Sequence, residues 1–115
     1  MKKNTLAIGM CALMLLVIST SGCVSSTSDV EYEVTGSASK VFITYQNENG
    51  GTSQDEAFVP WWYSFNGNSG DFVYVSAQNQ DESGSVTVTI YRDGEIFKTS
   101  TSSGGYVIAT ASGRI

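Results

Sequence analysis

Apolar and polar residues alternate through most of this 115-residue chain, and from residue 30 onward no segment reads as a helix. A period of two is typical of β-strands, because successive side chains point to opposite faces of a sheet. One face of each strand is then expected to enter a core, while the other meets water or a partner. The clearest alternating runs are VEYEVTG (30–36), KVFITYQN (40–47), DFVYVSAQ (71–78) and SVTVTIYRDG (85–94).

The breaks between these runs contain Gly, Asn, Asp and Ser, which tolerate the backbone angles of turns. Asp93-Gly94 predicts a two-residue hairpin turn. Short strands at this spacing predict an antiparallel sandwich or barrel. We expect residues 30–115 to form an all-β domain, an antiparallel immunoglobulin-like β-sandwich of about seven strands. The remaining strand candidates are 56–59, 61–65, 95–101 and 106–115.

Residues 1–22 differ from the rest of the chain and predict a signal peptide or a membrane anchor. A short positive start precedes the apolar run 6–18, and small polar residues follow it. This order is the layout of a secretory signal. The run has 13 residues, whereas a spanning helix needs about 20, so a cleaved signal is favoured over a retained anchor.

Cys23 would be the one cysteine of the mature chain, because Cys11 lies inside the apolar run. No intramolecular disulfide is then possible. The segment Thr20-Ser21-Gly22-Cys23 resembles the lipobox of prokaryotic lipoproteins, which implies lipidation of Cys23. The alternative is a plain signal or anchor with an incidental cysteine. The Ser/Thr-rich residues 23–29 predict a flexible tether between membrane and sandwich.

The exported part is acidic. Residues 23–115 contain four Lys and Arg against eleven Asp and Glu, a net charge of −7. This balance argues against nucleic acid as a partner, since phosphates require clustered Lys and Arg. It also argues against electrostatic adhesion to anionic lipid headgroups, so we expect membrane attachment to come from the N-terminal lipid or anchor.

The residue inventory predicts a protein that is not an enzyme. The chain has no histidine, and its serines have no candidate base, so no catalytic residue is expected. The carboxylate pairs Asp55-Glu56 and Asp81-Glu82 are adjacent in sequence, and on a strand such neighbours point to opposite faces. We expect no metal site and no cofactor.

The segment PWWYSF (60–65) holds both tryptophans of the chain. Trp61 and Trp62 are neighbours, so in a strand one should point inward and the other outward. One hypothesis is that they pack as core and rim. The other is that Trp61, Trp62, Tyr63, Tyr45 and Tyr74 form a binding patch, since Trp and Tyr are favoured at interfaces. Pro60 suits the start of an edge strand.

Five landmarks in order resemble the MmpS-type (mycobacterial membrane protein, small) transport accessory family. They are YEVTG (32–36), VFITYQNENG (41–50), FVPWWYSF (58–65), VSAQNQ (75–80) and VTVTIYRDGEIFKT (86–99). The resemblance implies a membrane-anchored β-sandwich outside the cytoplasmic membrane that assists a large exporter of lipids or siderophores. The expected location is the outer face of the cytoplasmic membrane or another membrane of the cell envelope. The alternative is a free-standing surface module that binds carbohydrate, lipid or protein through the aromatic patch.

Overall fold

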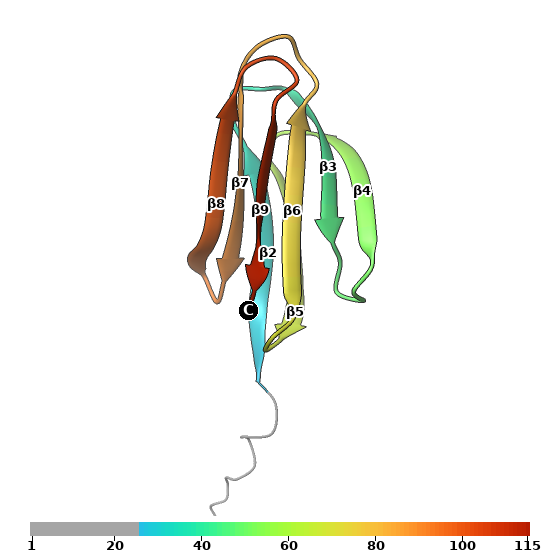
Figure 1. The fold of residues 1–115 in the computed structure, drawn as a ribbon, viewed down its shortest axis with the longest axis vertical. Helices are drawn as coiled ribbons and strands as arrows, with labels where there is room; N and C mark the ends of the chain where they lie inside the picture. Colours follow the sequence, from blue (N-terminus) through green and yellow to red (C-terminus); the bar gives the residue numbers. More distant parts are fainter. Residues whose placement is uncertain (1–25) are drawn as a thin grey trace, which may run out of the picture.

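The computed structural model describes residues 26–115. This part of the chain folds into eight β-strands joined by short turns (Figure 1). Among the described residues, no helix is long and apolar enough to cross a bilayer. The strands are β2 (Thr27–Thr35), β3 (Lys40–Gln46), β4 (Thr52–Phe58), β5 (Trp61–Asn68), β6 (Phe72–Asn79), β7 (Ser85–Arg92), β8 (Glu95–Ser103) and β9 (Ile108–Arg114).

The strands form two four-stranded sheets, β5-β2-β7-β8 and β4-β3-β6-β9, in which every neighbouring pair is antiparallel. The predicted antiparallel β-sandwich is confirmed, with eight described strands rather than about seven. Two packed antiparallel sheets are the architecture that immunoglobulin-like domains share. In one sheet, β2 lies between β5 and β7. In the other sheet, β3 and β4 form a hairpin.

Two strands begin earlier than predicted. β2 begins at Thr27, so residues 27–29 of the expected tether belong to the sandwich, because they pair with the end of β5. β4 begins at Thr52 rather than at residue 56. Residues 52–55 are polar and show no alternation, but they are extended because they pair with β3. The expected signal or anchor at 1–22 and the expected lipidation site at Cys23 lie outside the described residues.

The core lies between the sheets and contains the inward-facing residue of each alternating pair. On β2, Val30, Tyr32 and Val34 are buried, while Glu31 and Glu33 between them are not. This alternation is the pattern that the sequence predicted. The fully enclosed apolar residues of the other strands are Val41, Ile43, Val73, Val75, Ala77, Val86, Val88, Ile90 and Ala109.

The sheets approach each other most closely along β6, β7, β8 and β9, where Cα atoms of facing strands come within 8 Å. The inward residues of β9 are small: Ala109, Ala111 and Gly113. A Cβ atom at Gly113 would lie 2.8 Å from the ring of Phe97 on β8, closer than packed atoms allow. Small side chains on β9 therefore let this side of the sandwich close.

The opposite side of the sandwich is filled by large rings. The inward residues of β5 include Trp61, Tyr63 and Phe65, which pack against the core without being fully covered. Tyr45 of β3 meets them from the other sheet, with its ring centroid 5.2 Å from Trp61 and 4.6 Å from Tyr63. The sandwich is thus filled by bulky aromatics along the edges β4 and β5, and by alanine and glycine at β9.

The hydroxyl of Tyr32 ties the two sheets together. The ladder between β3 and β6 stops at Tyr45 and Val75. Just beyond this point, the Tyr32 hydroxyl donates a hydrogen bond to the carbonyl of Gln46 (2.8 Å) and accepts one from the N–H of Tyr74 (3.3 Å). One buried side chain on the first sheet therefore satisfies two backbone groups of the second.

We predict that Tyr32→Phe lowers the free energy of unfolding by about 1–3 kcal/mol, because it leaves two backbone groups without their partner. Urea unfolding followed by circular dichroism measures this change. Tyr74→Phe is the matched control: no hydrogen bond of the Tyr74 hydroxyl is found within residues 26–115, so a change within about 0.5 kcal/mol is expected. Equal stabilities of the two variants would contradict the role given to the Tyr32 hydroxyl.

Candidate functional site

The structure does not bring the five residues of the predicted aromatic patch onto one surface. Tyr45, Trp61 and Tyr63 point between the sheets and belong to the aromatic filling. Trp62 lies on the outer face of β5-β2-β7-β8, and Tyr74 lies on the outer face of the other sheet. The expectation that Trp61 and Trp62 point to opposite faces is confirmed, and Pro60 does precede an edge strand.

The aromatic filling forms a continuous stack at the side of the sandwich. The rings of Trp61 and Tyr63 are nearly parallel, with 8° between their planes and 6.3 Å between their centroids. Tyr63 lies 5.8 Å from Phe65, and Tyr32 lies 5.5 Å from Phe65. Offset and edge-on contacts at such distances add to the stabilisation gained from burial. The outermost rings of this stack are positioned rigidly at the edge of the protein.

Two carboxylates, one on β4 and one in the turn before it, bind the polar ends of these rings. The indole N–H of Trp61 donates to Asp55 Oδ2 of β4 at 3.1 Å. The hydroxyl of Tyr63 donates to Glu48, in the turn between β3 and β4. This bond raises the pKa of Tyr63 to about 12 and lowers the pKa of Glu48. Both carboxylates thus help to hold the edges β4 and β5 together through neutral donors.

A second polar–aromatic group lies on the outer face of the sheet β5-β2-β7-β8. Glu33 of β2 accepts hydrogen bonds from Trp62 Nε1 on one side (3.3 Å) and from the Tyr91 hydroxyl on the other (2.9 Å). The bond to Glu33 raises the pKa of Tyr91. Trp62 remains 54% exposed. Glu33 therefore holds two aromatic side chains in fixed positions on a solvent-facing surface.

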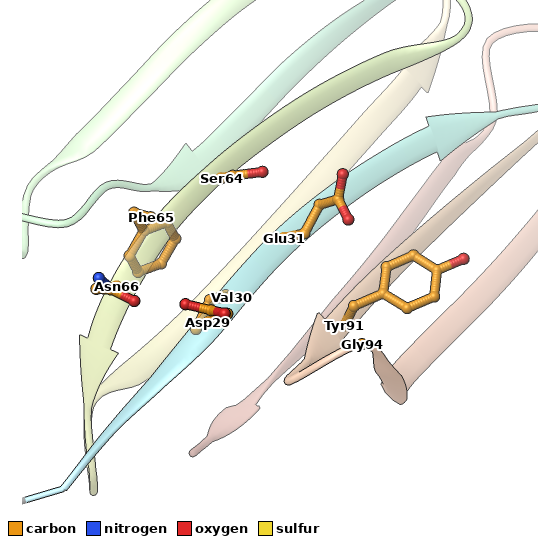
Figure 2. A pocket seen from close by; sticks show the side chains of 8 residues that line it. All are labelled: Asp29, Val30, Glu31, Ser64, Phe65, Asn66, Tyr91 and Gly94. Atoms are coloured by element: carbon orange, nitrogen blue, oxygen red, sulfur yellow. The ribbon is translucent and has the colours of Figure 1, made fainter.

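A shallow polar hollow adjoins this group, with a volume of about 480 Å³ (Figure 2). Glu31 stands at its centre, opposite Ser64 of β5 and Tyr91 of β7 in the strand pairing. Asp29 and Asn66 line its lower end. The hollow offers hydrogen-bond acceptors beside an aromatic ring, a combination that suits polar or cationic ligand groups.

The sequence reasoning did not single out Glu31, Glu33 or Tyr91. The alternation of apolar and polar residues in the sequence does place all three side chains on the outward faces of their strands. Their assembly depends on β2 lying between β5 and β7. Glu33 and Tyr91 are 58 residues apart in the chain, so no local pattern brings them together.

Three of the four carboxylates in the pairs Asp55-Glu56 and Asp81-Glu82 make structural contacts. Asp55 binds Trp61, whereas Glu56 points the other way and forms a salt bridge with Lys40 at 3.7 Å. Asp81 accepts hydrogen bonds from the N–H and hydroxyl of Ser39, which lower its pKa and fix the turn between β2 and β3. Within residues 26–115, no group of three or more acidic or cysteine side chains could hold a metal ion.

We predict that two of the six tyrosines have pKa values near 12, about two units above the ordinary value of 10. Burial raises the pKa of Tyr32 to about 12, and the bond to Glu48 does the same for Tyr63. Since both folded-state pKa values are raised, the stability that these groups contribute is complete below about pH 10 and is lost as the pH rises through 12. Absorbance at 295 nm during alkaline titration, with urea unfolding in parallel, measures both effects.

Glu48→Gln should return the pKa of Tyr63 toward 10 and leave that of Tyr32 unchanged. Glu56→Gln is the matched control, because Glu56 pairs with Lys40 and with no tyrosine. An unchanged titration curve for Glu48→Gln would contradict the assignment of the late step to Tyr63.

No protein-family model matches the chain, and no curated protein is similar to it. The resemblance of the sequence to the MmpS-type family therefore stays a proposal.

Proposed function

We propose that this protein is exported, held at the outer face of a cell-envelope membrane, and binds a partner protein there without catalysing a reaction. Attachment is through a lipid on Cys23 or through the retained apolar segment 1–22. Thr27 begins β2, so only four residue steps separate Cys23 from the sandwich. Four extended residues reach at most about 14 Å. A lipid on Cys23 would therefore keep the sandwich close to the bilayer.

The observation that carries partner binding is the fixed, exposed Trp62. Its indole N–H is bonded to Glu33, and more than half of its surface faces solvent. A large aromatic side chain that is already held in place loses little conformational entropy on binding, which is why Trp and Tyr dominate binding hot spots. Tyr91 shares the same carboxylate and extends the surface across β2.

Within this function, we propose the role of an accessory subunit of a large membrane exporter of lipids or siderophores, as in the MmpS-type family. The landmarks from YEVTG to VTVTIYRDGEIFKT support it, as does the presence of a β-sandwich over residues 27–114. The alternative is a free-standing surface module. The hollow around Glu31 favours this alternative for a carbohydrate ligand, since its carboxylates and amide could accept hydrogen bonds from sugar hydroxyls.

Attachment is tested by the intact mass of the protein purified from its own membranes. We expect a chain that begins at Cys23 and carries additional lipid mass. A mass that includes residues 1–22 and no lipid would contradict lipidation of Cys23 and would support attachment through a retained anchor. A chain that lacks both the lipid and residues 1–22 would contradict membrane attachment.

Partner binding is tested by photocrosslinking in intact cells. We expect p-benzoylphenylalanine in place of Trp62 to form an adduct with a multi-span membrane protein of the exporter class. The same residue in place of Ser112, which is exposed on the outer face of the other sheet, is the control and should give none. Adducts with glycans alone from position 62 would favour the surface module, and equal adducts from both positions would contradict a specific surface.

A further inference from the structure

The four edge strands of the sandwich are protected to different degrees against pairing with another chain. β4 carries Asp55 and Glu56, and β8 carries Glu95 and Lys98 with a register shift against β7. β9 ends in Arg114. Charges and irregular pairing on an edge are the usual means by which proteins prevent strand addition. β5, with the sequence WWYSFNGN, has no charged residue and no proline within its bounds.

The edge of β5 is also long and regular. Its register with β2 runs without interruption from Trp61, opposite Val34, to Asn68, opposite Thr27. Among the strands of residues 26–115, β5 has β2 as its one neighbour, and none of these strands pairs with its other side. Eight residues at about 3.3 Å each give an edge of roughly 26 Å. Such an edge presents unpaired backbone N–H and C=O groups that another extended chain could meet.

Carboxylates flank this edge on both sides. Glu31 and Glu33 stand one strand away on the outer face, while Asp55 and Glu48 reach toward the inward rings of β5 from the second sheet. The described residues contain one salt bridge, Lys40–Glu56, so none of these four carboxylates is paired with a cation there. A strand added to β5 would therefore meet negative charge on both of its faces.

This charge pattern decides between two occupants. A second copy of the chain would bring β5 against β5, with like-charged carboxylates on both sides and a net charge of −7 on each exported part. A basic segment with cations at alternating positions would instead place them all on one face, the outer face that carries Glu31 and Glu33. Exposed Trp62 adds a ring over which an Arg or Lys side chain gains a cation–π contact.

We infer that the open edge of β5 binds an extended segment of the partner protein that carries Lys or Arg at alternating positions, as an added strand of the sheet. This inference rests on the proposed function and names the part of the partner that is bound. Backbone pairing along β5 supplies affinity, and the flanking carboxylates select for basic side chains.

The first test titrates the full chain, in detergent, with a short synthetic peptide in which lysine alternates with threonine and valine. The two tryptophans of the chain both lie on β5, so their fluorescence reports directly on this edge. We expect a saturable change in emission and slower hydrogen exchange of β5 amides. The same peptide with N-methylated backbone amides should bind at least tenfold more weakly. Equal affinities, or no binding of the unmodified peptide, would overturn the inference.

The second test changes the edge at Ser64, which is exposed on the outer face of β5. Ser64→Lys should weaken peptide binding at least tenfold, whereas the matched variant Ser64→Glu should bind as tightly as the wild type or more tightly. Equal losses in both variants, with urea unfolding unchanged, would overturn the role of charge. Self-association through β5 together with no binding of the peptide would assign the edge to a second copy.

The outcomes separate this inference from the proposed function. Peptide binding at β5 without an exporter adduct from position 62 would support the edge site and contradict the exporter role. An exporter adduct without peptide binding would support the role and overturn the edge site.

Discussion

The unequal size of the inward-facing side chains sets the shape of this sandwich. Ala109, Ala111 and Gly113 let β9 lie close to the facing sheet, and Gly113 leaves room for the ring of Phe97. On the other side, Trp61 and Tyr63 fill the space between the edges β4 and β5. Protein interiors are packed to a uniform density, so bulky rings on one side and small residues on the other require sheets that are not equally spaced.

Polar groups on the aromatic side of the sandwich find their partners in Tyr32 and in two carboxylates. The ladder between β3 and β6 stops at Tyr45 and Val75, so the backbone groups beyond it need other partners, and the polar ends of the rings between the sheets need partners too. The Tyr32 hydroxyl reaches across the core to Gln46 and Tyr74, while Asp55 and Glu48 bind the outer ends of Trp61 and Tyr63. The aromatic side of the sandwich is therefore held by directional bonds as well as by burial, and this positions β5 firmly.

The sequence predicted what depends on local alternation and did not predict what depends on strand order. Trp61 points inward and Trp62 outward because neighbours in a strand alternate, and this holds whichever strand lies beside them. The separation of Trp62 from Tyr74, by contrast, depends on β5 and β6 belonging to different sheets. Glu33 could be placed on an outward face, but its contacts with Trp62 and Tyr91 require β2 to lie between β5 and β7. The early start of β4 was missed because its pairing with β3 overrides a weak local preference.

The direction of β5 relative to the proposed attachment at Cys23 limits which partner segments could pair with it. β2 starts and β9 ends at the same end of the sandwich, the end at which a tether from Cys23 would attach (Figure 1). β5 is antiparallel to β2, so its last residue, Asn68, pairs with Thr27 at this end, and Trp61 lies at the far end. A strand bound along β5 would thus begin near the bilayer and extend about 26 Å along the sandwich. A segment buried in the membrane cannot meet this requirement. An extended basic segment that leaves the membrane surface beside a domain tethered as proposed would meet it, and such a segment would belong to an extracytoplasmic loop or terminus of a membrane protein.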